Sequence, residues 1–172
     1  MTGKGEGGAP PATAPYVAVV GPGEGSAGEL AAAERVGHRL AERGAVVVCG
    51  GLGGAMEAAC KGAKEAGGLT VGILPGSDRR EANRYVDVAV ATGLAEARNA
   101  LVVRTADTVI AVGGAYGTLS EIALALRARI PVVGLQTWEL ARGGRREEAI
   151  MSAETPEEAV ELALAALGGR PG

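Results

Sequence analysis

Three glycines and a glutamate stand close together in residues 106–126, ADTVIAVGGAYGTLSEIALAL, with a spacing that suits an anionic ligand. A buried strand is predicted over 107–112, and the apolar spacing changes to that of a helix from Thr118. The glycines between them are Gly113, Gly114 and Gly117. Because a glycine turn lets backbone N–H groups approach a ligand, a phosphate there would meet unpaired donors and the positive end of a helix dipole. Glu121 is predicted one turn inside the helix, near the same mouth.

The spacing of Thr118 and Glu121 also has a purely structural interpretation. T-x-x-E is the pattern of a capping box, in which the Glu121 carboxylate would accept a hydrogen bond from the Thr118 backbone N–H. In that case the carboxylate would hold the start of the helix and take no part in chemistry. This segment by itself leaves both interpretations open.

A second glycine turn follows the strand predicted over 45–49. It is formed by Gly50, Gly51, Leu52, Gly53 and Gly54. The helix after it is expected to turn Met56, Ala59, Cys60 and Ala63 inward. A second strand-turn-helix unit of this kind indicates that the two turns serve the same ligand.

Arginines are the side chains available to bind an anion near these turns. A helix capped by Thr92 is expected to bury Leu94, Ala97, Leu101 and Val102, and Arg98 falls beside that apolar face. Arg98 could bind the anion, or it could lie over the helix as an ordinary surface arginine. The loop over 75–85 carries Arg79, Arg80 and Arg84, which could be solvated or could gate an anionic ligand.

Strands and helices alternate along the chain on short connections. Strands are predicted over 16–20, 45–49, 69–74, 86–91, 107–112 and 131–135. A capping box from Ser26 to Glu29 begins the first helix, and Pro156 begins the last. This alternation predicts an α/β fold, a Rossmann-like doubly wound, mostly parallel sheet flanked by helices on both faces. Every glycine turn follows a strand, so the turns should gather at one edge of the sheet and make one site.

One part of the chain fits this alternation less well. Residues 136–150 form a polar insertion that contains Trp138 and the basic residues Arg142, Arg145 and Arg146. The insertion could be a lid, a dimer contact or a loose loop.

Length and composition narrow the class of protein. The 172 residues suit a single domain, expected over 15–172, behind a disordered tail over 1–14 that is rich in Gly, Pro and Ala. A net charge of -3 and the absence of Phe argue against a nucleic-acid surface. No apolar run is long enough for a membrane span, and no signal-peptide pattern is present, so we expect a cytoplasmic location.

Cofactors and metals are not expected. Cys49 and Cys60 suit small buried hydrophobic positions of a reduced protein, and the single histidine, His38, leaves too few ligands for a metal site. Gly23, Gly25 and Gly28 match G-x-G-x-x-G, but the second strand ends in glycines and lacks the acid that would hold a ribose. A nicotinamide cofactor is therefore not predicted.

Three segments resemble the LOG family, long labelled "possible lysine decarboxylase". They are CGGLGGAME at 49–57, EARN at 96–99 and GGAYGTLSE at 113–121, and the resemblance covers nearly the whole chain after the tail. It implies a Rossmann-like homodimer that hydrolyses the N-glycosidic bond of purine or cytokinin nucleoside 5′-monophosphates to free base and ribose 5-phosphate. It also implies that Arg98 and Glu121 are the catalytic pair. Phosphate or nucleotide binding would involve Gly50, Gly51, Gly53, Gly54, Met56, Asn99, Gly113, Gly114, Tyr116, Gly117 and Thr118.

Glycosidic cleavage suits these side chains better than decarboxylation does. Departure of a base leaves positive charge on the ribose, which the Glu121 carboxylate could stabilise while it activates water. Arg98 stays protonated, so it would fix the phosphate or the sugar. A pyridoxal decarboxylase needs a lysine for its Schiff base, and the only lysines are Lys4, Lys61 and Lys64, in the tail and in a packed helix.

Two positions depart from the usual LOG motif. Val112 stands where the motif has Pro before the two glycines, and Asn99 stands where it has Lys after the arginine. The segment TGLAEARNAL at 92–101, with Ala115 and Tyr116 inside the glycine motif, is similar to a short branch of the superfamily that resembles molybdenum-cofactor carrier proteins and, distantly, DNA-processing protein A. Three functions stay open: the hydrolase, a non-catalytic carrier or sensor of a nucleotide or of molybdenum cofactor, and a single-strand DNA binder, which the acidic balance disfavours.

Overall fold

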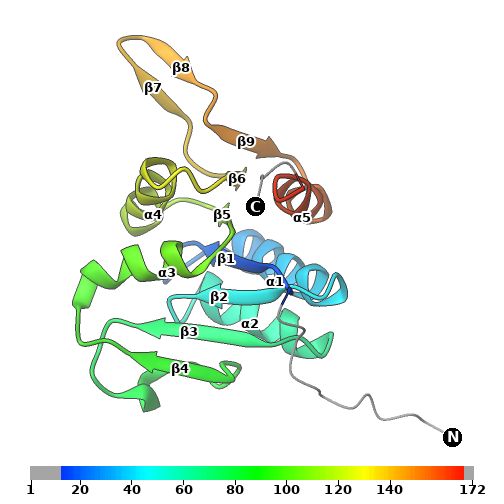
Figure 1. Cartoon of the computed structure of the whole chain (residues 1–172), viewed down its shortest axis with the longest axis vertical. Helices are drawn as coiled ribbons and strands as arrows, with labels where there is room; N and C mark the ends of the chain where they lie inside the picture. Colours follow the sequence, from blue (N-terminus) through cyan, green and yellow to red (C-terminus); the bar gives the residue numbers. More distant parts are fainter. Residues whose placement is uncertain (1–12, 169–172) are drawn as a thin grey trace, which may run out of the picture.

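A seven-stranded parallel sheet forms the centre of the structure, a computed structural model that describes residues 13–168 (Figure 1). Its strands are β1 (Tyr16–Val20), β2 (Val46–Cys49), β3 (Thr70–Leu74), β4 (Val88–Ala91), β5 (Thr108–Val112), β6 (Val132–Leu135) and β9 (Ile150–Ala153). They lie in the order β4-β3-β2-β1-β5-β6-β9. The central strands β1, β2 and β5 are almost entirely apolar, as is typical of strands whose two faces are both covered by helices.

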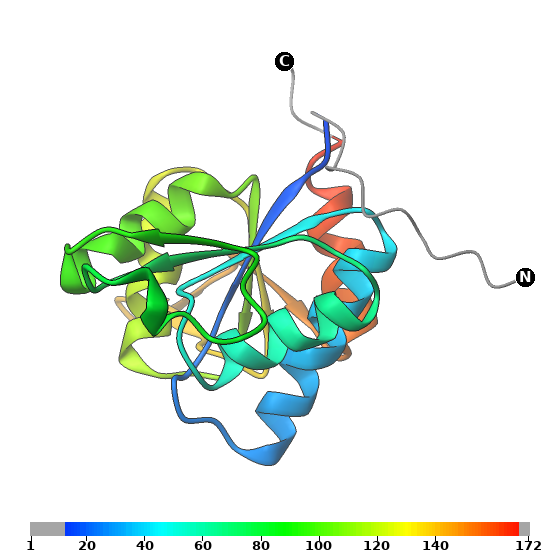
Figure 2. The ribbon, with the colours of Figure 1, turned by 90° about the horizontal axis from the view of Figure 1, so that it is seen from below.

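Helices cover the sheet on both sides, which confirms the predicted doubly wound, Rossmann-like fold (Figure 2). One face is covered by α1 (Ala27–Glu42), α2 (Ala55–Glu65) and α5 (Pro156–Ala165). The other face is covered by α3 (Asn99–Thr105) and α4 (Tyr116–Arg127). Two short 3₁₀ helices, η1 (Arg79–Glu81) and η2 (Ala95–Arg98), lie in the connections on either side of β4.

Helices α1 and α2 pack with their backbones nearly in contact. A Cβ at Gly37 would lie 1.9 Å from the Ala59 carbonyl oxygen, and a Cβ at Gly62 would lie 1.9 Å from the Glu34 carbonyl oxygen. Only glycine fits at these two positions, so the composition rich in small residues serves helix packing. This contact fixes the position of α2 and of the glycine turn before it.

The strand order reverses between β1 and β5. This reversal indicates where on the sheet a ligand would bind. In open parallel sheets, ligands bind outside the carboxyl ends of the strands at such a reversal. Glycine turns follow β1, β2 and β5 at this edge, and a Cβ at Gly21 would lie only 2.7 Å from the Val112 carbonyl oxygen. The structure thus confirms that the turns gather in one place.

The segment after β6 differs from the prediction. Within the insertion predicted over 136–150, residues form the antiparallel hairpin of β7 (Leu140–Arg142) and β8 (Arg145–Glu147). The chain then continues as β9, a seventh sheet strand that pairs with β6. Because β9 is a short edge strand without a continuous apolar run, its place in the sheet depends on pairing with β6 and leaves little local signal.

The single helix predicted after Thr92 is wrong. Gly93 and Ala95 have φ of 65° and 48°, so the chain first forms η2 and becomes α-helical only from Asn99. Leu94 and Leu101, which were expected to be buried, are 49% and 40% exposed. The buried residues of α3 are Val102, as predicted, and Val103.

The ends of the chain add little to the site. Residues 1–12 of the predicted tail and residues 169–172 lie outside the described part, and Ala14 packs against the core. Within residues 13–168, none of the helices has both the length and the apolar character to cross a lipid bilayer.

Candidate anion-binding site at the carboxyl edge of the sheet

Helix α4 begins at Tyr116, earlier than predicted, and its first turn has no capping side chain. Its N-cap residue is Ala115, which cannot accept hydrogen bonds from the first N–H groups through its side chain. The capping-box interpretation of Thr118 and Glu121 is therefore wrong. The Thr118 hydroxyl is buried and has no hydrogen-bond partner within residues 13–168. An unpaired buried hydroxyl beside an uncapped helix N-terminus indicates a place where an anion can bind.

Arg98 lies inside the molecule, 8% exposed, and not on the surface. Its guanidinium rests on the second glycine turn, since a Cβ at Gly50 would lie 2.7 Å from both Nη1 and Nη2. Nη1 lies 3.8 Å from Glu121 Oε1. The Nε atom is buried and finds no partner in the described part of the chain. The surface interpretation of Arg98 is thus wrong, and the structure brings together the two side chains that the sequence singled out.

Asn99 occupies the position of the usual lysine and makes two side-chain contacts. Its Oδ1 accepts a hydrogen bond from Arg98 Nη1 at 2.8 Å, and its Nδ2 donates to Ser120 Oγ at 3.0 Å. Ser120 belongs to α4, so Asn99 holds the Arg98 guanidinium beside the start of that helix. At this position the usual motif has a second positive charge. Here a neutral side chain holds Arg98 in place instead.

Burial sets the charge of the Arg98–Glu121 pair. Burial raises the pKa of Glu121 to about 7, and the Arg98 guanidinium offsets only part of this effect. Burial also lowers the pKa of Arg98, against the opposing influence of Glu121 and Cys49, but an arginine remains protonated at neutral pH. Because this pKa lies near neutral pH, Glu121 is present there in both its neutral and its ionised form, and the neutral form leaves a net positive pair. The pair can attract an anion in that form.

The Gly113 and Gly114 end of the predicted cradle is already engaged. The Gly113 N–H donates to the Leu135 carbonyl at 3.0 Å, which extends the sheet. Glu29 Oε2 accepts a hydrogen bond from the Ser26 N–H, while Oε1 faces Gly113 so closely that a Cβ there would lie 2.1 Å from it. Hydrogen bonds from the backbone and hydroxyl of Ser26, and from the Gly114 backbone, lower the pKa of Glu29. An ionised carboxylate therefore lies at this end, and the α4 end of the turn remains for a ligand.

Sequence reasoning missed two residues that shape the site. Glu29 was expected only to cap α1, since no local pattern shows that its second oxygen meets the turn after β5. Asn83 had no signal beyond its place in a polar loop. Its Nδ2 donates to the carbonyls of Gly51 and Leu52 at 3.3 and 2.9 Å, so it tethers the second glycine turn.

The other predicted residues divide between the site and its surroundings. The Met56 sulfur would lie 2.6 Å from a Cβ at Gly50, so it packs beside Arg98. A Cβ at Gly54 would lie 2.3 Å from the Gly23 carbonyl oxygen, and one at Gly53 would lie 3.9 Å from it. Gly53 and Gly54 thus join the second turn to the first.

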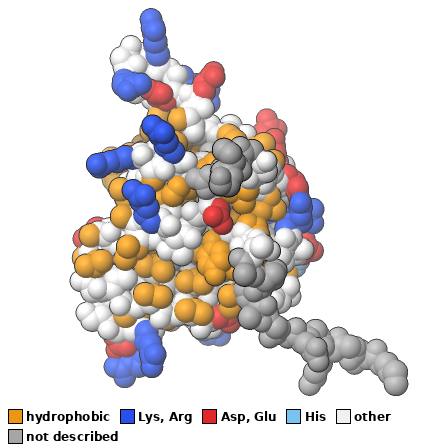
Figure 3. Space-filling model, viewed as in Figure 1, with side chains coloured by type: hydrophobic (Ala, Val, Ile, Leu, Met, Phe, Trp, Pro, Cys, Tyr) orange, Lys and Arg blue, Asp and Glu red, His pale blue; other side chains and the backbone are white. Residues whose placement is uncertain are grey.

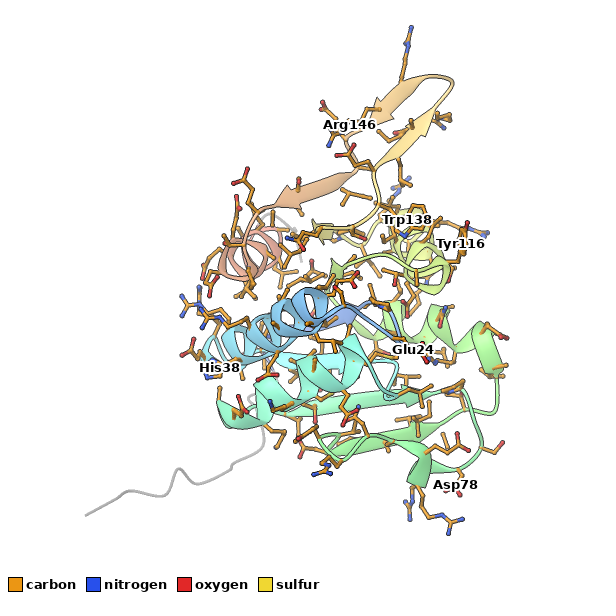
Figure 4. The ribbon with its side chains drawn as sticks, turned by 180° about the vertical axis from the view of Figure 1, so that it is seen from behind. Glu24, His38, Asp78, Tyr116, Trp138 and Arg146 are labelled. Atoms are coloured by element: carbon orange, nitrogen blue, oxygen red, sulfur yellow. The ribbon has the colours of Figure 1, made fainter. Side chains whose placement is uncertain are left out.

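Tyr116 lies at the mouth of the site, 82% exposed, and its ring centroid is 5.7 Å from that of Trp138 (Figure 4). Two of the three loop arginines are engaged outside the site: Arg80 pairs with Asp78 at 2.7 Å, at the opposite end of the molecule from Tyr116 in Figure 4, and Arg84 lies over the Tyr85 ring. Lys61 and Lys64 also point elsewhere, since they pair with Glu34 and Asp87.

Known proteins resemble this chain over most of its length. It is 43% identical over 148 residues to an uncharacterised protein of Archaeoglobus fulgidus, and the match covers 86% of this chain and 93% of that protein. It is 38% identical, with a TM-score of 0.84, to the molybdenum cofactor binding protein of the phototrophic bacterium Rippkaea orientalis. It is 32% identical, with a TM-score of 0.77, to the molybdenum cofactor carrier protein of Chlamydomonas reinhardtii. Each of these two structural matches covers 91% of this chain and 99% of the other.

A more distant similarity concerns the fold alone. DNA processing protein A of Helicobacter pylori is 19% identical with a TM-score of 0.65, over 88% of this chain and 81% of that one. The sequence pattern of one family matches residues 14–160, nearly all of the domain described above. The chain belongs to the SLOG cluster4 family, as the strand-turn-helix motifs at its carboxyl edge led us to expect.

Proposed function

We propose that this protein is a non-catalytic carrier that binds molybdenum cofactor, a pterin phosphate, through the phosphate group. One observation carries the proposal: the uncapped N-terminus of α4 lies with a buried, unpartnered Thr118 hydroxyl and is close to a buried arginine whose Nε lacks a partner in residues 13–168. Backbone N–H groups, a hydroxyl and a guanidinium are the donors that a phosphate accepts best.

Two further observations support a carrier over an enzyme. The solved structures that match at 38% and 32% identity bind or carry molybdenum cofactor, by their names. In addition, Asn99 stands where the LOG motif has lysine and contacts Arg98 as a neutral side chain, so the site lacks a positive charge that the motif provides. Arg98 and Thr118 would then hold the phosphate, and Glu121 would balance the charge of Arg98.

Thr118→Val separates the ligand role of the hydroxyl from a structural one. Because the hydroxyl is buried without a partner in the described fold, valine should raise the free energy of unfolding by about 1 kcal/mol or more. The same change should weaken binding of inorganic phosphate about tenfold, because a hydrogen bond to the anion is lost. Urea unfolding and isothermal titration calorimetry measure the two effects.

A matched control and a cofactor assay complete the test. Thr105→Val removes a hydroxyl that donates to the Leu101 carbonyl at 2.7 Å on the exposed side of α3, and it should leave phosphate binding unchanged. Cofactor released from a molybdoenzyme should co-elute with the wild-type protein in gel filtration, as measured by molybdenum content, and less should co-elute with Thr118→Val. Failure of the wild type to retain molybdenum, or equal retention by both proteins, would contradict the proposal.

A second candidate function is the phosphoribohydrolase, and the Arg98–Glu121 geometry favours it. The two groups are 3.8 Å apart, and a carboxyl with a pKa of about 7 can act as acid or base at neutral pH. Release of free base from purine and cytokinin nucleoside 5′-monophosphates, measured by liquid chromatography, tests it directly. Turnover in the wild type that Glu121→Gln abolishes would replace the carrier proposal with the hydrolase.

We also propose a cytoplasmic homodimer. Cys49 and Cys60 are free thiols, as in a reducing compartment. Four large apolar residues are exposed on the side of β4 and α3: Val88, Val90, Leu94 and Leu101. Hydrophobic side chains gather on this part of the surface (Figure 3). An apolar surface beside an edge strand suits a partner copy, and Leu94→Glu with Leu101→Glu should then yield monomers in light scattering.

A further inference from the structure

Two thiols face each other beside the second glycine turn. Cys49 is the last residue of β2, and Cys60 lies in the middle of α2, the helix that follows the turn. Both residues are buried, their thiols are free, and their Sγ atoms are 3.4 Å apart. A disulfide has an S–S distance of about 2.05 Å, so a small movement of the two side chains would bring the sulfurs to bonding distance.

Both sulfurs are connected to the second glycine turn by hydrogen bonds. The Gly51 N–H donates to Cys49 Sγ at 3.3 Å. Asn83, whose side-chain amide donates to two backbone carbonyls of the turn, also acts on the Cys60 sulfur through a hydrogen bond. A chemical change at the two sulfurs therefore reaches the backbone of the turn.

The surroundings of the two thiols make them unequal acids. A hydrogen bond from the Cys60 thiol lowers the pKa of Cys49, and the Gly51 N–H and the charge of Arg98 lower it further against the effect of burial. The same hydrogen bond and burial raise the pKa of Cys60. Cys49 therefore loses its proton first, while Cys60 keeps its own. A thiolate beside a protonated thiol is suited to attack an oxidant and then to be resolved by its neighbour.

The glycine turn controls how an oxidant reaches the buried thiols. Four of the five residues over 50–54 are glycines, and residues 52–54 are partly exposed. Gly54, the N-cap residue of α2, makes no side-chain capping hydrogen bond. A segment with so few side chains buries little apolar surface, so its local opening costs less free energy than opening of the sheet. Hydrogen peroxide is little larger than water and can reach Cys49 through such an opening.

We propose that Cys49 and Cys60 are an oxidative modification site, at which a peroxide converts the two thiols into a disulfide. The Cys49 thiolate attacks one peroxide oxygen: an S–O bond forms, the O–O bond breaks, and the hydroxide that leaves takes up the proton that Cys49 released. The Cys60 sulfur then attacks the resulting sulfenic acid. The S–S bond forms, the S–O bond breaks, and the Cys60 proton leaves with the hydroxide as water. Two thiols are oxidised, and one peroxide is reduced to two waters.

Formation of this disulfide should alter the anion site. The two sulfurs must approach each other by about 1.4 Å, which disturbs the hydrogen bond from the Gly51 N–H to Cys49. It also displaces Gly50, the next residue, on which the Arg98 guanidinium rests. Affinity for inorganic phosphate should then fall about fivefold, the effect of one lost hydrogen bond. This effect rests on the proposed function, whereas the oxidation itself does not.

Thiol counting by mass spectrometry tests the oxidation. After treatment of the folded wild type with hydrogen peroxide, unfolding and addition of iodoacetamide, neither cysteine should be alkylated, and dithiothreitol should restore both. Trypsin leaves both cysteines in one peptide over 44–61, which should be lighter by two hydrogen atoms. Cys60→Ser should stop at a Cys49 sulfenic acid that dimedone traps, whereas Cys49→Ser should leave the Cys60 thiol unreacted. Wild type that keeps both thiols, or equal trapping in the two variants, would overturn the proposal.

Calorimetry with inorganic phosphate tests the effect on the anion site. The affinity of the wild type should fall on oxidation and recover with dithiothreitol, while that of Cys49→Ser should not respond to peroxide. This variant retains Met56, and dithiothreitol does not reverse methionine oxidation, so both comparisons exclude Met56 as the cause. A disulfide that leaves phosphate affinity unchanged would overturn the link to the site.

Hydrogen exchange of the backbone amides over 50–54 separates this inference from the proposed function. Exchange in this segment should become faster on oxidation, whether or not phosphate binds. If the reduced protein binds no phosphate, the proposed function fails, and the thiol count and the exchange rates decide the inference alone. Exchange rates that are the same in the oxidised and reduced protein would show that the disulfide does not reach the turn, and would overturn it.

Discussion

The buried carboxyl of Glu121 should make the stability of this protein depend on pH, and Glu121→Gln should remove that dependence. Burial raises the pKa of Glu121 from the usual 4.5 to about 7, so the folded state holds its proton more tightly than the unfolded state does. The free energy of unfolding therefore falls as pH rises from 4.5 to 7 and is level above that range. The full effect of such a displacement is about 3 kcal/mol, because one unit of pKa is about 1.4 kcal/mol.

Urea unfolding of both proteins, followed by circular dichroism at pH 5 and pH 8, measures this effect. Glutamine does not titrate, so the variant lacks this loss of stability. From pH 5 to pH 8 the unfolding free energy of the wild type should therefore fall by about 2–3 kcal/mol relative to that of Glu121→Gln. Other groups titrate equally in both proteins and cancel. A shift below about 0.5 kcal/mol would refute the reasoning, since Glu121 would then titrate as a solvated carboxyl would.

Three further changes test the remaining parts of the site. Glu29→Gln keeps the capping box but removes the negative charge beside Gly113, so affinity for inorganic phosphate should rise several-fold in calorimetry, and a fall would show that the carboxylate helps to bind the ligand. Asn83→Ala removes the two hydrogen bonds to the second glycine turn and should lower the free energy of unfolding, measured in urea, by about 2 kcal/mol. An unchanged value would mean that the conformation of the turn does not depend on Asn83. Gly50→Ala places a Cβ against Arg98 and should weaken phosphate binding about tenfold; binding equal to wild type would show that Arg98 is not a ligand contact.

The fold class and the sheet edge at which the candidate site lies could be predicted from the sequence alone. Strands β1, β2, β3, β5 and β6 lie within a residue of their predicted ends, because each is a continuous apolar run bounded by turn residues, and that signal is local. The glycine turns follow those strands, and parallel strands present their carboxyl ends at one edge. The pairing of Arg98 with Glu121 was anticipated from a motif, and the structure confirms it at 3.8 Å.

Which hydrogen-bond donors at that edge are free depends on contacts that form only in the folded protein. The N–H of Gly113 belongs to the sheet and Glu29 lies beside Gly114, while the Thr118 hydroxyl is buried without a partner in residues 13–168. These outcomes depend on contacts between segments far apart in the chain, as does the pairing of β9 with β6. A residue type and its spacing define what a side chain can do, but whether its atoms meet water, another residue or an open site is a property of packing, which no local pattern contains.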